Sequence, residues 1–183
     1  DLEEKGYNVL LTREPGGTLF SEKVRSLLLV EGKGISATTE LLLILAARND
    51  HVEKVISPEL ARGMIVLCDR FIDSTIVYQG FAAGLDPDEV EKLACHIVPL
   101  IPDCTFLLDL PLHESIKRRD GRQEFPDTME QKELSFHEQV RFGFLAIAKK
   151  YPQRIHVLDA SESVEQIFEK ARVSVLNMIR EKA

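Results

Sequence analysis

The sequence has few cysteines and no metal-binding pattern among them. Its three cysteines, Cys68, Cys95 and Cys104, are an odd number and lie within apolar runs. Cysteines with this spacing form neither a disulfide framework nor a zinc site of the CxxC type. We therefore expect buried, reduced thiols and a cytoplasmic protein.

The chain also lacks a long apolar run and an excess of basic residues. No stretch approaches the roughly 20 residues of a membrane span. The opening segment Asp1–Lys5 has neither the basic region nor the apolar core of a signal peptide. The net charge of −7 disfavours a general nucleic-acid or membrane-surface binder, which needs a basic face. We expect neither a membrane nor a nucleic-acid polymer as a partner.

Three common functional signatures are missing as well. The five histidines are scattered without HExxH or triad spacing, so we expect structural roles for them. Among them, His51 follows Arg48 on a similar helix face, and His137 is expected to pack beside Phe136. The phosphate-binding motif GxxxxGK[ST] occurs nowhere in the 183 residues.

Short apolar runs alternate with helical patterns along the chain. The runs that we expect to form buried strands are Tyr7–Leu11, Met64–Cys68, Cys104–Leu110 and Ile155–Leu158. The expected helices are Phe20–Leu29, Thr38–Arg62, Pro87–Leu100, Leu112–Arg119, Met129–Lys150 and Ser163–Glu181. A chain of 183 residues fits one domain with a sizeable core. The alternation predicts an α/β fold, with a parallel sheet covered by helices on both faces.

The first candidate site follows the first expected strand. Residues Thr12–Thr18 read Thr-Arg-Glu-Pro-Gly-Gly-Thr and form the loop that leaves this strand. Ligands of open α/β sheets bind at the carboxyl ends of the strands. Arg13 is able to hold a phosphate, and the glycines let the backbone approach a ligand closely. The alternative is an ordinary turn with a surface ion pair.

The second candidate site follows the expected strand Met64–Cys68. Asp69 and Arg70 come directly after it, again at the ligand-binding edge. Arg70 is suited to clamp a phosphate, and Asp69 to orient it or to act through metal-bound water. The polar and aromatic residues that follow, suited to contact a nucleobase, are Ser74, Thr75, Tyr78 and Gln79. The alternative is a structural Asp–Arg pair.

Two further arginine positions stand out. Arg48 follows the apolar stretch Leu41–Ala47 and either extends to solvent or reaches into a pocket, where it donates to a ligand carbonyl. The segment Lys117–Arg122 is strongly basic in an acidic chain. It is either a solvated helix end or an arginine-bearing flap that closes over transferring phosphates.

In their order, these segments resemble the thymidylate kinases of the bacterial type, which are P-loop nucleoside-monophosphate kinases. The likeness covers essentially the whole chain. The motifs that carry it are Thr12–Thr18, Glu40–Arg48 with His51, Cys68–Phe71, Asp73–Thr75, Tyr78–Gly80, Pro102–Asp103, Leu108–Pro111, Phe136–His137, Val140–Arg141 and Asp159–Ala160. The ordered set is far more specific than any one of its parts.

The resemblance implies a three-layer αβα fold and a single domain over residues 1–183. It implies transfer of the γ-phosphoryl group of ATP to dTMP, giving dTDP and ADP, with Mg²⁺, in dTTP biosynthesis. It also implies a homodimer, to which the apolar face of Thr38–Arg62 is suited. In such a reaction the protein mainly positions the two nucleotides and neutralises charge on the transferring group.

The resemblance also implies residue roles at matching positions. Arg70 binds the dTMP phosphate, and Arg48 donates to the thymine ring. The residues expected along the base and under the deoxyribose are Ser74, Thr75, Gln79 and Tyr78. Arg13 and Glu14 face the phosphate and sugar, with Glu14 and Asp69 as candidate Mg²⁺ ligands. The lid spans about residues 117–130, and its catalytic arginine is among Arg118, Arg119 and Arg122.

Three departures from the family pattern qualify these expectations. Ile44 stands where the family usually has a phenylalanine that stacks on thymine, and Asp127–Thr128 stands where it commonly has Asp-Arg. The family also begins with a strand, a P-loop and a helix, whereas this chain opens on what resembles the end of that helix. We expect that strand and P-loop to precede Asp1 in the natural protein. The alternatives are an inactive or truncated relative that binds a nucleotide or partner, and a kinase of this fold for another nucleotide.

Overall fold

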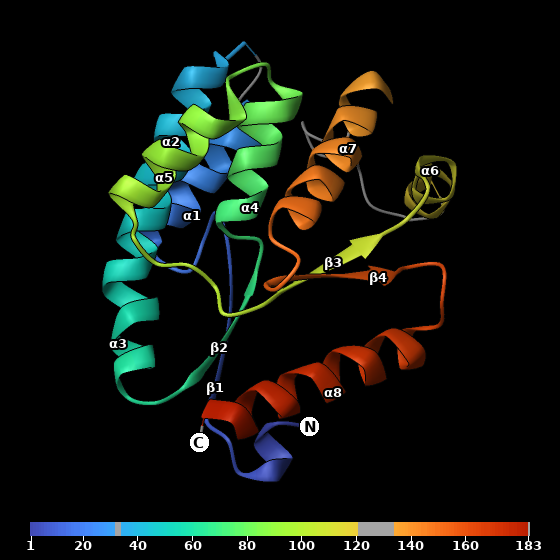
Figure 1. Cartoon of the computed structure of the whole chain (residues 1–183). Helices are drawn as coiled ribbons and strands as arrows, with labels where there is room; N and C mark the ends of the chain where they lie inside the picture. Colours follow the sequence, from blue (N-terminus) through green and yellow to red (C-terminus); the bar gives the residue numbers. More distant parts are fainter. Residues whose placement is uncertain (32–33, 121–133, 183) are drawn as a thin grey trace. The chain divides into compact units, whose positions relative to one another are not determined.

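The computed structural model describes residues 1–31, 34–120 and 134–182 (Figure 1). Helices and parallel strands alternate through this part of the chain, as predicted. The described residues divide into two compact units, residues 1–101 with 134–143 and residues 102–120 with 144–182. The strands form two separate two-stranded sheets, one in each unit.

The sheet of the first unit consists of β1 (Val9–Arg13) and β2 (Ile65–Asp69), which run parallel. A short 3₁₀ turn, η1 (Glu3–Lys5), precedes β1 and ends at Gly6, whose positive φ of 86° closes it. Each residue of β1 pairs with one residue of β2, from Val9 opposite Ile65 to Arg13 opposite Asp69. The predicted strands are confirmed, although each extends one or two residues further toward its carboxyl end.

Two long helical segments of the first unit meet around a small apolar cluster. Helix α1 (Leu19–Ser26) continues into the π-helical turn η2 (Leu27–Glu31), and α2 (Ala37–His51) continues through η3 (Val52–Ile56) into α3 (Ser57–Ala61). The hydroxyls of Thr18 and Ser36 cap the amino ends of α1 and α2. The cluster consists of Val24, Leu28 and Ala47, with Ile35, Leu43 and Ile44 packed against it.

A helical segment that the sequence did not predict follows β2. It consists of α4 (Ile72–Thr75) and the π-helical η4 (Ile76–Ala82). Helix α5 (Pro87–Ile97) comes next, and Asp86 caps it as its sequence predicts. This helix ends earlier than expected because Val98 precedes Pro99, and the residue before a proline favours an extended conformation.

The sheet of the second unit consists of β3 (Thr105–Asp109) and β4 (Ile155–Asp159), also parallel. Its helices are α6 (Leu112–Asp120) and α8 (Val164–Lys182). Helix α7 (Leu134–Lys150) runs through both units. All three predicted helices are confirmed where the structure describes them, and the beginning of the predicted Met129–Lys150 helix lies outside the described residues.

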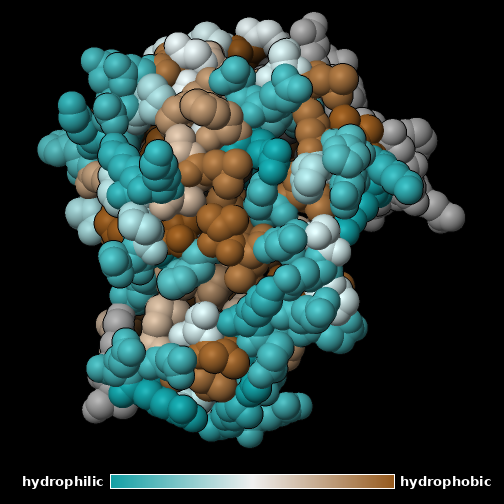
Figure 2. Space-filling model, turned by 45° about the vertical axis from the view of Figure 1, so that its right-hand side comes forward, coloured by the Kyte–Doolittle hydropathy of each residue, from teal (hydrophilic) through white to brown (hydrophobic). Residues whose placement is uncertain are grey.

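The surface carries apolar side chains, which appear brown in Figure 2. Among the strand residues, the exposed apolar side chains include those of Leu11, which is 79% exposed, and Leu108, which is 57% exposed. All three cysteines are thiols, but each is half-buried rather than fully buried as predicted. Within the described residues, every helix is too short or too polar to cross a membrane.

Candidate active site

The carboxyl ends of β1 and β2 place the two predicted site loops side by side. The strands are parallel and in register, and the backbone N–H of Glu14 continues the ladder by donating to the carbonyl oxygen of Asp69 at 3.0 Å. The loop Thr12–Thr18 therefore begins beside Asp69 and Arg70. This edge is where ligands bind in open α/β sheets.

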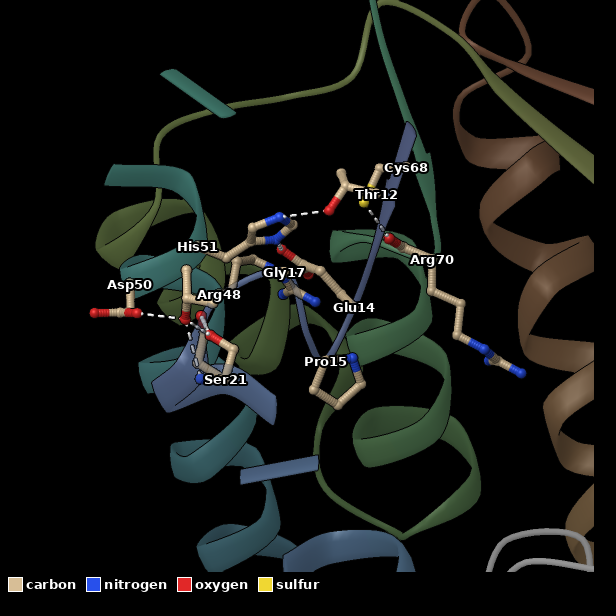
Figure 3. A network of polar contacts seen from close by, with 12 residues as sticks. Thr12, Glu14, Pro15, Gly17, Ser21, Arg48, Asp50, His51, Cys68 and Arg70 are labelled. Carbon is tan, nitrogen blue, oxygen red and sulfur yellow. Dashed lines mark hydrogen bonds and ion pairs between the residues drawn. The ribbon is translucent and has the colours of Figure 1, made fainter. Parts of the chain in front are cut away.

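A buried ion pair joins the first loop to helix α2. Arg48 Nε donates to Glu14 Oε2 at 2.6 Å, and the two side chains are 3% and 4% exposed. Arg48 does not extend to solvent, which was the alternative at the sequence level. Buried charges require such pairing, since an isolated ion in a low-dielectric interior is very costly. Figure 3 shows Arg48 and His51 of α2 facing Glu14 of the loop.

His51 completes the surroundings of Glu14. Its Nδ1 lies 3.2 Å from Glu14 Oε1, and its Nε2 lies 2.8 Å from Thr12 Oγ1. An ionised carboxylate only accepts hydrogen bonds, so Nδ1 carries the proton facing Glu14. In the neutral imidazole, Nε2 then accepts from the Thr12 hydroxyl. His51 is fully buried and thus has the structural role that the sequence predicted for the histidines.

Gly17 is required where the loop passes His51. Its φ of +84° is in the left-handed region, and a Cβ placed there would overlap the imidazole ring. The neighbouring Glu14–Pro15 peptide is cis, and Arg25 Nη1 donates to the Pro15 carbonyl oxygen at 3.1 Å. The glycine thus allows the close approach of the loop to α2.

Arg48 has one donor with no partner. Its Nη2 donates to Thr75 Oγ1 at 2.8 Å, and its guanidinium lies 5.1 Å from the ring centroid of Phe71. Its Nη1 is buried and makes no hydrogen bond. An unsatisfied buried donor costs free energy, so such an atom in a native structure indicates a missing partner.

Gln79 has the matching feature, an acceptor with no partner. Its Nε2 donates to Glu40 Oε1 at 2.6 Å, and both side chains are buried. The opposite amide atom, Oε1, is buried without a hydrogen bond. Helix α2 and segment 72–82 are therefore joined twice, by Arg48 with Thr75 and by Glu40 with Gln79.

Arg70 lies at the same edge but is exposed. Its positive φ of 65° is unusual for a residue with a side chain, and such positions concentrate at functional sites. The guanidinium lies 4.9 Å from the ring centroid of Tyr78, and in Figure 3 it points away from the cluster of Glu14 and His51. The Tyr78 ring in turn packs edge-on against Phe136, with centroids 6.1 Å apart.

Cys68 supports the backbone of this turn. Its Sγ donates to the carbonyl oxygen of Arg70 at 3.1 Å. Burial raises the pKa of the Cys68 thiol to about 12, and the negative charge of Glu14 contributes. The thiol is therefore neutral at physiological pH and acts as a hydrogen-bond donor.

The described residues hold no group of three or more His, Cys, Asp or Glu side chains placed to bind a metal. Of the two candidate ligands, Asp69 is exposed at the sheet edge, whereas Glu14 is buried against Arg48 and His51. Mg²⁺ sites commonly use one or two carboxylates together with substrate phosphates. Asp69, which is exposed, therefore suits such a Mg²⁺ site better than Glu14, which is buried and already paired.

The surroundings of the other predicted site residues differ. Arg13 Nη2 contacts Glu22 Oε2 at 3.4 Å in an exposed pair, and Ile44 packs against the Val24 cluster. Ser74 is half-buried on α4. In the second unit, Arg118 Nη1 donates to the Ala160 carbonyl oxygen at 2.9 Å.

Most of the other residues predicted to form the lid lie outside the part of the chain that the structure describes. The structure describes the backbone but not the side chain of Arg119, and neither Arg122 nor residues 121–130 of the lid. These roles stay predictions.

Two further residues join this site, Glu40 and Phe71, which belong to motifs of the family resemblance but have no specific role predicted from the sequence. The signal for Glu40 is its spacing, because Glu40, Ile44 and Arg48 follow one another at intervals of four and share a helix face. An acidic residue on the apolar face of a helix indicates a buried partner. Phe71 gave no signal beyond its place next to Arg70.

Comparison with known proteins finds similarity over most of the chain. The family model described as Thymidylate kinase matches residues 1–171. The thymidylate kinase of Chlamydia trachomatis serovar D is 46% identical over 181 residues, covering 97% of this chain and 89% of that protein. That of Mesoplasma florum is 42% identical over 180 residues, covering 97% of this chain and 85% of that protein.

A solved structure agrees as well. The crystal structure of thymidylate kinase from Ehrlichia chaffeensis matches with a TM-score of 0.73 and 38% identity, covering 93% of this chain and 80% of that one. The predicted α/β fold of the P-loop kinase type is thereby confirmed. The chain belongs to the thymidylate kinase family.

Proposed function

We propose that this protein transfers the γ-phosphoryl group of ATP to dTMP, giving dTDP and ADP. The observation that carries the proposal is the pair of buried atoms without partners, Arg48 Nη1 and Gln79 Oε1. One is a donor and the other an acceptor, and both belong to residues on the facing sides of α2 and segment 72–82. A nucleobase between them supplies the missing partners.

Thymine has the complementary edge. Its O4 accepts a hydrogen bond, and its neighbouring N3–H donates one. Arg48 Nη1 is suited to O4, and Gln79 Oε1 to N3–H. Cytosine has an amino group in place of O4 and an acceptor at N3, so it mismatches both atoms. The site therefore favours a 4-oxo pyrimidine.

The exposed groups of the same edge suit the rest of a nucleotide. Arg70 is suited to donate to the dTMP phosphate with two N–H groups. Tyr78, whose ring lies 4.9 Å from the Arg70 guanidinium, is suited to lie under the deoxyribose. Ser74 and Thr75 belong to the same helical segment as Gln79. Arg13 is the last residue of β1, and the family resemblance implies that it faces the phosphate.

Phosphoryl transfer requires little covalent chemistry from the protein. The chain positions the acceptor and supplies positive charge near it, with Arg70 at the phosphate. Mg²⁺, when bound, neutralises charge on the phosphate oxygens. Asp69 is the residue suited to hold it, because its carboxylate is exposed beside Arg70 while Glu14 is already paired.

The lid, the assembly and the location of the protein complete the proposal. Of the three candidate lid arginines, Arg119 and Arg122 are preferred over Arg118, whose guanidinium binds the Ala160 carbonyl. Leu42 of α2 is 55% exposed and is suited to a homodimer contact. A cytoplasmic homodimer is the expected form, and its mass in solution tests the assembly.

Nucleotide selectivity tests the proposed function. We expect ADP release in a coupled assay to be much faster with dTMP than with dUMP, dCMP, dGMP or UMP. Direct binding of the same nucleotides in the absence of ATP is the matched measurement, since it reports on the acceptor site alone. Equal rates and equal affinities across the panel would contradict the thymidylate assignment.

A further inference from the structure

Glu40 controls which amide atom Gln79 presents to its surroundings. Its Oε1 accepts from Gln79 Nε2 at 2.6 Å, in a pair of buried side chains that are 8% and 1% exposed. A carboxylate has acceptors only, so it binds the NH₂ end of the amide and not the oxygen end. The Gln79 oxygen is consequently the atom left without a partner.

A glutamine by itself does not distinguish a thymine from a cytosine. If its amide turns by 180°, it exchanges an acceptor for a donor and accommodates either N3–H or an unprotonated N3. The orientation must therefore be held by another group. Among the described residues, Glu40 is the group bonded to the Gln79 amide.

We infer that Glu40 is a specificity-determining positioning residue, which excludes 4-amino pyrimidines by locking the Gln79 amide with its oxygen toward the base. The inference rests on the proposed function, because it assigns the base of that acceptor site. Glu40 acts through Gln79 and need not touch the nucleotide. Arg48, eight residues later on α2, supplies the second discriminating atom, which is independent of Glu40.

The test compares the affinities of dTMP and 5-methyl-dCMP, which differ only in the 4-substituent and the N3 proton. In Glu40→Gln, the new amide is able to accept from Gln79 or to donate to it, so both orientations of Gln79 become available. We expect the dTMP/5-methyl-dCMP affinity ratio, measured by calorimetry on the whole chain, to fall on the order of tenfold, the size of one hydrogen bond. Glu53→Gln, an exposed neutralisation beyond the end of α2, is the matched control and should leave the ratio unchanged.

The exchanged pair Glu40→Gln with Gln79→Glu provides the rescue. It keeps one carboxylate and one amide at the contact, but residue 79 now offers acceptors only. We expect the ratio to return to the wild-type value or to exceed it. A role of Glu40 in packing alone predicts no such recovery, and the double variant also serves if Glu40→Gln is poorly folded.

The outcomes separate the two hypotheses. If the wild-type chain prefers dTMP, but Glu40→Gln keeps the full ratio, or the exchanged pair does not restore it, then the role assigned to Glu40 is wrong while the proposed function stands. If the wild-type chain binds dTMP and 5-methyl-dCMP equally well, the proposed function fails and the role of Glu40 fails with it.

Discussion

The two units differ in what they bury. Among the described residues, every buried polar or charged side chain lies in the first unit: Glu14, Ser21, Glu40, Arg48, His51, Asp73, Thr75 and Gln79. The buried side chains of the second unit are apolar: Ile147, Ala148, Ile155 and Ala160. In the second unit, the exposed side chain of Arg118 donates to the Ala160 carbonyl oxygen.

The buried polar and charged side chains of the first unit carry a free-energy cost that the apolar interior of the second unit does not. Burying a charge is unfavourable unless it is paired, and a buried ion pair is often no more stabilising than apolar residues of the same size. The three buried side-chain atoms without a hydrogen bond in the described structure, in Arg48, Gln79 and His137, also lie in the first unit. Fold stability alone does not account for such an arrangement, whereas the proposed recognition of a nucleobase accounts for the atoms of Arg48 and Gln79.

The largest expected effect separates function from stability within the first unit. Replacing Arg70 with alanine removes an exposed phosphate donor, so we expect kcat/KM for dTMP to fall by about 10³-fold. The free energy of unfolding should change by less than about 0.5 kcal/mol, because the side chain is at the surface. Arg62→Ala, another exposed arginine, should change neither. Retained turnover in Arg70→Ala would refute the phosphate-binding role.

The next prediction compares one arginine in each unit. Arg48→Met leaves Glu14 buried without its cation, so we expect a loss of about 3–5 kcal/mol in the free energy of unfolding. Arg118→Met removes one hydrogen bond to a backbone carbonyl and should cost about 1 kcal/mol. Denaturant titration of both variants measures the difference. Equal losses would show that the buried pair is not the special feature of the first unit.

Gly17 and Gly63 give a third comparison, within the first unit. Both have positive φ, of 84° and 78°, but only Gly17 lies against another side chain, His51. Alanine at Gly63 should cost about 1–2 kcal/mol for the left-handed backbone. Alanine at Gly17 should cost about 1–3 kcal/mol more for the overlap with the imidazole. Thermal or chemical unfolding measures both, and equal costs would contradict the close approach of the loop to α2.

The smallest expected effect lies in the second unit and concerns a pKa. The hydroxyl and backbone N–H of Ser161 donate to Asp159 and lower the pKa of its carboxyl below the ordinary value. The lowered pKa stabilises the folded state. This stabilisation is fully present above the ordinary pKa of the carboxyl and is lost as the pH falls through its lowered pKa. Ser161→Ala removes the hydroxyl, so the pKa should rise toward the ordinary value.

NMR titration of the Asp159 carboxyl measures this shift, with Ser115→Ala as an exposed serine control. A carboxyl whose pKa does not change in Ser161→Ala would show that the hydroxyl bond is not its cause. Because neither Asp159 nor Ser161 is among the residues proposed to bind the acceptor nucleotide, we expect no change in dTMP affinity.

Local sequence patterns were sufficient to predict most of the strands and helices. The apolar runs gave the four strands to within two residues at either end. The Asp86 cap with Pro87 gave the start of α5. The helical segment 72–82 was missed because its face pattern is weak: Ile72, Ile76 and Val77 are buried along with polar Asp73, Thr75 and Gln79, which removes the amphipathic period.

The site was predicted as a set of residues but not as a set of contacts. The order of motifs placed Glu14, Arg48, Arg70 and Gln79 in one site, yet the partner of Glu14 lies 34 residues away, and that of Gln79 lies 39 residues away. Which donor or acceptor remains without a partner depends on how whole elements pack. The sequence therefore indicated a nucleotide site, and the structure adds the two buried atoms without partners on which the proposed base contacts rest.

A structure of the protein with dTMP tests the central claim most directly. The account predicts thymine O4 within hydrogen-bond distance of Arg48 Nη1, N3 within hydrogen-bond distance of Gln79 Oε1, and the phosphate on Arg70. A complex in which dTMP binds elsewhere, or in which both buried atoms still have no partner, would contradict it.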